Sequence, residues 1–147
     1  MDIEQCLATI DLLCGRDFPE QRGRTDRGSA GPGYHMAELA ASHGLRAGDG
    51  AEREATAEDF RAWMELVADR LNGRLGQAEH LGLVTLGVRI ARGEEIPEPW
   101  ARLSHVVRDA YVWSPQRRDR WVALGVADLD DSDEVHLLVA VTDTDPP

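Results

Sequence analysis

The sequence predicts an α+β domain of about five helices packed on a C-terminal antiparallel β-hairpin, with a three-stranded sheet as an open alternative. Three observations lead to this class. Several segments before residue 113 repeat apolar residues every three or four positions, which is the period of an amphipathic helix. Two apolar runs of strand length, 121–127 and 135–141, flank an acidic turn. The chain has 147 residues, so we expect residues 1–147 to form a single domain.

The first expected element is a helix that begins after Asp2. Asp2 can cap its first turn, with Gln5 three residues later, and Gly15 is suited to end it. The spacing of the apolar residues predicts one buried stripe. This stripe consists of Ile3, Cys6, Leu7, Ile10, Leu13 and Cys14.

Residues 16–33 interrupt every periodic pattern. Glycine and proline occur here among four arginines. A loop of this length is uncommon unless it is functional or disordered. We therefore predict a flexible Gly/Arg-rich loop at 16–33, and the sequence leaves open whether this loop orders over a ligand.

Four further helices are expected before the hairpin. A short one over 34–43 and a longer one over 56–73 have apolar residues at helical spacing. The segment 77–92 is ambiguous, and we interpret it as a buried helix because it is longer than most strands. The last helix is expected over 100–110. The competing strand interpretation of the third segment rests on the alternation of Val84, Leu86, Val88 and Ile90.

Both faces of the expected hairpin strands are mostly apolar. A two-stranded ribbon is marginal alone and has to be covered. One face can pack on the helices of the same chain, whereas the other needs a second cover. A matching hairpin from a second subunit would supply it, so we predict a homodimer. A third strand within 77–92 would reduce that need.

Composition excludes several classes of protein. The formal net charge of −11 argues against nucleic-acid binding, because phosphate contacts need a positive field. No stretch reaches the ~20 apolar residues of a membrane span, and the acidic N-terminus differs from a secretory signal. We therefore expect a cytoplasmic protein that contacts neither nucleic acid nor membrane. Cys6 and Cys14 form no metal-binding motif with the histidines, and no metal or cofactor is predicted.

The connection from Tyr111 to Trp121 is the most site-like segment. Arginine offers a planar fork for a carboxylate or phosphate, and aromatic faces can stack a flat ligand. The segment therefore predicts a site for an anionic small molecule, aromatic ones included. The plainer interpretation is that its tryptophans anchor the core and its arginines pair with surface acids. The candidate ligand-binding residues are Tyr111, Trp113, Arg117, Arg118, Arg120 and Trp121.

His105 and Asp109 stand four residues apart on the expected helix 100–110. At this spacing the carboxylate can orient the imidazole, which is what a general base requires. We therefore add His105 to the candidate ligand site as its acid or base. A solvated charged face is the plainer interpretation, because Arg102 and Arg108 lie on the same helix.

Two functional hypotheses follow from these patterns. The first is a non-catalytic accessory protein that binds a protein partner through the hairpin and its acidic end, at Asp130, Asp131 and Asp133. The second is a small-molecule-binding enzyme or sensor whose ligand lies at 111–121 under the 16–33 loop. The sequence has no nucleophile elbow, phosphate-binding loop or dinucleotide fingerprint. The accessory role is therefore the leading hypothesis.

Overall fold

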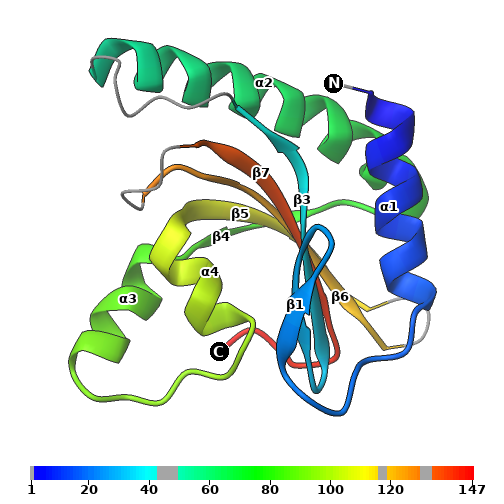
Figure 1. Cartoon of the computed structure of the whole chain (residues 1–147), viewed down its shortest axis with the longest axis vertical. Helices are drawn as coiled ribbons and strands as arrows, with labels where there is room; N and C mark the ends of the chain where they lie inside the picture. The colour runs from blue at the N-terminus through cyan, green and yellow to red at the C-terminus, as the bar shows by residue number, and fades with distance from the viewer. Residues whose placement is uncertain (1, 43–49, 116–118, 130–133) are drawn as a thin grey trace.

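The computed structural model describes residues 2–42, 50–115, 119–129 and 134–147. Within these ranges the chain forms four helices and one seven-stranded antiparallel sheet (Figure 1). The predicted α+β class is confirmed. The predicted architecture of about five helices on a hairpin or a three-stranded sheet is wrong, because four segments predicted as loop or helix contribute strands.

The predicted hairpin lies at the centre of this sheet. It consists of β6 (Trp121–Ala127) and β7 (His136–Thr142), in a register that pairs Leu124 with Val139. The strand order is β1-β2-β3-β7-β6-β5-β4. The other strands are β1 (Gly23–Thr25), β2 (Gly28–Gly31), β3 (Tyr34–Ala41), β4 (Glu79–Gly82) and β5 (Val107–Trp113).

Two helices cover each face of the sheet (Figure 1). The helices α1 (Ile3–Gly15) and α2 (Gly50–Leu75) lie on one face, and α3 (Val84–Ala91) and α4 (Trp100–Val106) lie on the other. The predicted start of the first helix is confirmed, since Oδ1 of Asp2 accepts a hydrogen bond from the Gln5 amide at 3.3 Å. No helix in the described ranges is long and apolar enough to cross a membrane.

The two faces of the central hairpin contribute to two separate apolar cores. Leu124 and Val139 pack with α1 and α2, whereas Ala123 and Ala140 pack with α3 and α4. The second face is therefore covered by helices of the same chain. The cover that a second subunit was expected to supply is already present, so the hairpin no longer gives a reason to predict a homodimer.

The segment predicted as a helix over 34–43 is the strand β3. Its residues are good helix formers, but β3 pairs with β7 along seven register positions, from Tyr34–Thr142 to Ala41–His136. Consecutive residues 34–37 are all buried, because both faces of the strand are covered. Tertiary pairing has overridden the local helix propensity.

The segment 16–33, predicted as a flexible loop, contains the strands β1 and β2. One of its glycines is required for this pairing. A Cβ on Gly28 would collide with the backbone carbonyl oxygen of Met36 on the neighbouring β3. The glycine content that suggested mobility thus permits a close approach of two strands.

The last two predicted helices are each divided into a helix and a strand. Residues 77–92 form the edge strand β4 and then α3, so the alternation that suggested a strand belongs to the helix. Residues 100–110 form α4 and the start of β5, because the chain becomes extended at Val107. The remaining long helix, predicted over 56–73, is confirmed within α2.

The side chain of Asn72 links α2 to the sheet. Its Oδ1 accepts hydrogen bonds from the indole Nε1 of Trp113 and from the backbone amide of Ala78, each at 3.0 Å. Trp113 is 1% exposed. A buried donor left without an acceptor costs about 1–3 kcal/mol.

We predict that Asn72→Ala lowers the free energy of unfolding by about 2–4 kcal/mol, because it removes the acceptor of two donors. Urea denaturation measures this loss. Trp113→Phe removes one of the donors, so Asn72→Ala should cost less in that background than in the wild type. Equal costs in both backgrounds would show that the hydrogen bond to Trp113 contributes nothing.

Candidate functional site

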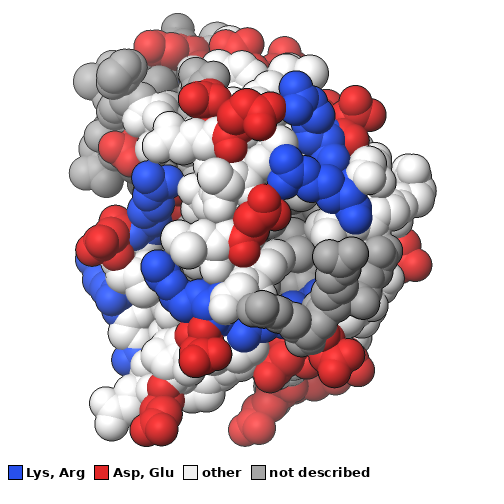
Figure 2. All heavy atoms as spheres, turned by 90° about the vertical axis from the view of Figure 1, so that its right-hand side faces the viewer, with Lys and Arg blue, Asp and Glu red and all other residues white. Residues whose placement is uncertain are grey.

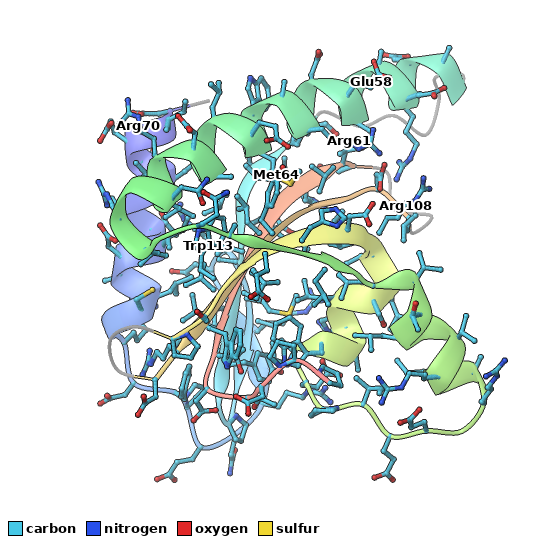
Figure 3. All side chains as sticks on the ribbon, turned by 180° about the vertical axis from the view of Figure 1, so that it is seen from behind. Glu58, Arg61, Met64, Arg70, Arg108 and Trp113 are labelled. Atoms are coloured by element: carbon cyan, nitrogen blue, oxygen red, sulfur yellow. The ribbon has the colours of Figure 1, made fainter. Side chains whose placement is uncertain are left out.

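A polar cavity of about 570 Å³ lies between α2 and the β4–β5–β6 side of the sheet. In Figure 3, Arg61 and Met64 extend from α2 toward the sheet, and Arg108 lies below them. Elsewhere the space between α2 and the sheet is filled by apolar side chains. We call this space the interlayer cavity. It is lined by Gly50, Arg53, Glu54, Ala57, Arg61, Met64, Glu65, His80, Arg108, Asp109, Ala110, Tyr111, Val126 and Asp128.

The helical period of α2 explains which of its residues line the cavity. Arg53, Ala57, Arg61 and Met64 are separated by three or four residues, so they share one face of the helix. The same helix continues with the buried residues Val67, Ala68 and Leu71. The first half of α2 thus presents two arginines to the cavity beside the buried Ala57 and Phe60, whereas the buried residues of its second half are all apolar.

The register of β4 and β5 explains which of their residues line the cavity. His80 is paired with Tyr111, and Gly82 with Asp109. Directly paired residues project to the same face of a sheet, so His80, Tyr111 and Asp109 all face α2. The side chains of His80 and Asp109 are 64% and 50% exposed, whereas Tyr111 is half-buried.

Polar contacts connect the two walls. Nη2 of Arg61 lies 2.7 Å from Oδ2 of Asp128, and the hydroxyl of Tyr111 donates to Oε1 of Glu65 at 2.6 Å. On the sheet wall, Nε2 of His80 lies 3.7 Å from Oδ1 of Asp109. These contacts fix the directions in which donors and acceptors face the cavity.

The hydrogen bond to Glu65 raises the pKa of Tyr111, with burial as the second cause. A phenol ordinarily ionises near pH 10, so Tyr111 remains a neutral donor at physiological pH. Two charged side chains of the lining lack such contacts within the described residues. Within the described residues, the side chains of Arg108 and Glu54 make no hydrogen bond or ion pair.

The arrangement can hold a small polar molecule. The volume falls within the range of roughly 300–1,000 Å³ that is typical of ligand pockets. Arg108 offers a cation, Glu54 offers an acceptor, and the rings of His80 and Tyr111 offer flat surfaces at 6.2 Å between centroids. The described residues include no group of three His, Cys, Asp or Glu side chains placed to hold a metal ion.

The predicted ligand site at 111–121 is not gathered in one place. Tyr111 lines the interlayer cavity, whereas Trp113 is buried in the core beside it. Nη1 of Arg120 donates to the carbonyl oxygens of Leu13 and Arg16, at 2.9 and 2.6 Å, and holds the end of α1. Trp121 donates to Asp145 on the other side of the sheet at 2.9 Å. The remaining members, Arg117 and Arg118, lie outside the described residues.

The predicted pair of His105 and Asp109 is separated by the end of α4. His105 belongs to that helix, while Asp109 belongs to β5 and lies near His80. Sequence reasoning therefore chose the wrong histidine for this carboxylate. The signal that could have found the cavity is the charged stripe of Arg53, Arg61 and Glu65 on the face of α2 that meets the sheet.

Comparison of the chain with protein families, with curated proteins and with solved structures gives no match.

We predict that one of the two tyrosines ionises above the ordinary value of about 10. The raised pKa means that the contact of Tyr111 with Glu65 stabilises the fold at lower pH and is lost as the pH rises through that pKa. The ultraviolet absorbance of tyrosinate measures the transition. Tyr111→Phe should remove it, and Glu65→Gln should move it to lower pH. A titration unchanged by Glu65→Gln would contradict the assigned cause.

Proposed function

We propose that the protein binds a small aromatic anion in the interlayer cavity. The observation that carries this proposal is the polar space between two layers that elsewhere form an apolar core. Most of its polar side chains are exposed, among them Glu54, His80 and Arg108, so a molecule that enters from solvent can reach them.

The lining residues favour a particular ligand chemistry. Arg108 has no partner among the described residues, so it can receive a carboxylate in a charge-assisted hydrogen bond. Glu54 can accept a hydrogen bond from a donor on the ligand. The rings of His80 and Tyr111 can contact a flat ring. An aromatic acid with an amino or hydroxyl substituent combines these features.

The proposal concerns binding and contains no reaction. Some polar groups of the cavity are already held by contacts within the chain. Tyr111 is held as a donor by Glu65, and Arg61 is held by Asp128. The proposed site shares Tyr111 with the ligand site predicted from the sequence. The other predicted members are replaced by residues of α2, β4 and β5.

The accessory role rests on other residues. Asp130, Asp131 and Asp133, which were expected to bind a protein partner, lie outside the described residues. Binding of a protein partner through this acidic end therefore stays a prediction. The cytoplasmic location and the absence of nucleic-acid binding also stay predictions.

We predict that 4-aminobenzoate binds the wild-type protein and shifts the amide NMR signals of Arg108, Asp109 and Tyr111. Arg108→Ala should weaken binding about tenfold or more, because it removes a hydrogen bond between two charged groups, which is typically worth about 1.5–3 kcal/mol. Aniline has the ring and the amine without the carboxylate, so it should bind less tightly.

Arg92→Ala is the matched control, because Arg92 is an exposed arginine that does not line the cavity. This variant should bind 4-aminobenzoate as the wild type does. The proposal fails if 4-aminobenzoate shifts no signal of the cavity, or if the two arginine variants lose affinity equally.

A further inference from the structure

We infer a second binding site, for an anion with an aliphatic chain, on the opposite face of the sheet. A cavity of about 660 Å³ lies there between α4 and the β1–β2 hairpin. We call it the hairpin cavity. It shares no lining residue with the interlayer cavity. Its lining is Arg24, Thr25, Asp26, Arg27, Gly28, Ser29, Met36, Ala37, Glu38, Arg102, His105, Val106, Ala127, His136 and Leu138.

The register of the sheet places cationic and apolar groups of this cavity on one face. Arg24 pairs with Ser29, and Ser29 pairs with Met36. Directly paired residues share a face, so Arg24 projects to the same side as Met36. Met36 in turn pairs with Ala140, which packs in the core of α3 and α4.

The opposite wall is one face of α4. His105 and Val106 follow Arg102 by three and four residues, so both project to the same side of the helix as Arg102. The neighbouring residues Leu103 and Ser104 are buried against the domain. The helix therefore presents two polar side chains and one apolar side chain to the cavity.

The floor of the cavity is aliphatic. Met36, Ala127 and Leu138 belong to the second apolar core, and Val106 packs against that core while remaining partly exposed. Met36, Ala127 and Leu138 are already buried, so a hydrocarbon chain placed on this floor would remove mainly its own apolar surface from water.

Three basic side chains at the cavity have no partner within the described residues. They are Arg24, Arg102 and His105, all exposed. Other basic groups of the lining are already engaged: Arg27 donates to Thr9 at 3.2 Å, and His136 lies 3.0 Å from Glu134 and 3.5 Å from Glu38. Asp26, at the tip of the hairpin, is an acid without a described partner.

These cations differ from arginines on the face that carries α1. Acidic and basic side chains alternate on the face that carries α1 (Figure 2). There Arg70 and Arg74 are neutralised by Glu4 and Asp11, at 2.7 and 2.8 Å. In a chain with a formal net charge of −11, two arginines and a histidine that converge without partners are suited to bind an anion.

The arginines at the rim and the aliphatic floor together define the class of ligand. Arg24 and Arg102 approach the cavity from different walls, so both can contact one carboxylate or phosphate at its rim. The aliphatic floor then accommodates the chain attached to that group. In the interlayer cavity, two of the three arginines, Arg53 and Arg61, already contact Asp128, and only Arg108 has no partner among the described residues.

The experiment measures binding of butyrate, hexanoate, octanoate and hexyl phosphate to the full chain by amide NMR. The expected signals to shift are those of Gly28, Ser29, Arg102 and Val106. Affinity should increase roughly twofold to fourfold for each added methylene, since a fully buried methylene corresponds to about fourfold. Acetate and hexanol, which each lack one half of the ligand, should bind more weakly than hexanoate.

Arg24→Ala and Arg102→Ala should each weaken hexanoate binding about tenfold or more, as expected for the loss of one charge-assisted contact. Both side chains are exposed and have no described partner, so the variants should keep the wild-type spectrum elsewhere. Arg92→Ala is the control with the same loss of charge, and it should bind hexanoate like the wild type.

Three results would overturn the inference. Affinity that does not change with chain length would show that the floor contributes nothing to binding. Unchanged affinity in both arginine variants would remove the role of the cations. Shifts confined to Arg108–Tyr111 would place the anion in the interlayer cavity. Because the two cavities share no residue, failure here leaves the proposed aromatic site to its own test.

Discussion

The structure depends on burying both faces of the β6–β7 hairpin. Six of the seven residues of each strand are buried, so neither face can meet water. The chain satisfies this constraint by placing β3 and β5 beside the hairpin and two helices on each side of the resulting sheet. Each outer strand or helix extends a layer that the burial of β6 and β7 requires.

The two cavities lie where these layers stop being apolar. Under the first half of α2, arginines and glutamates face His80, Asp109 and Tyr111, and the core gives way to a polar space. On the other face, the hairpin cavity lies between α4 and the β1–β2 hairpin, and Arg24 and Arg102 line it. Both sites thus arise from incomplete apolar cover of one sheet, but they differ in charge pairing and therefore in ligand chemistry.

Some elements could be predicted from local pattern and others could not. The helix α1 has a helical period and a cap, the body of α2 has a helical period, and the hairpin strands are apolar runs around a turn. In contrast, β3 consists of helix-forming residues and gains its conformation from pairing with β7. The segments 77–92 and 100–110 each change from one conformation to the other, and a continuous apolar period concealed the boundary at Val107.

The sequence by itself determined the α+β class, the two long helices, the central hairpin and the need to cover both of its faces. Only the tertiary structure decided what covers the second face, since α3 and α4 replace the second subunit that local reasoning required. It also decided which polar residues meet, separating His105 from Asp109 and bringing Tyr111 to Glu65. The physical reason is that period and propensity act between neighbours in sequence, whereas strand pairing and cavity lining join residues far apart in the chain.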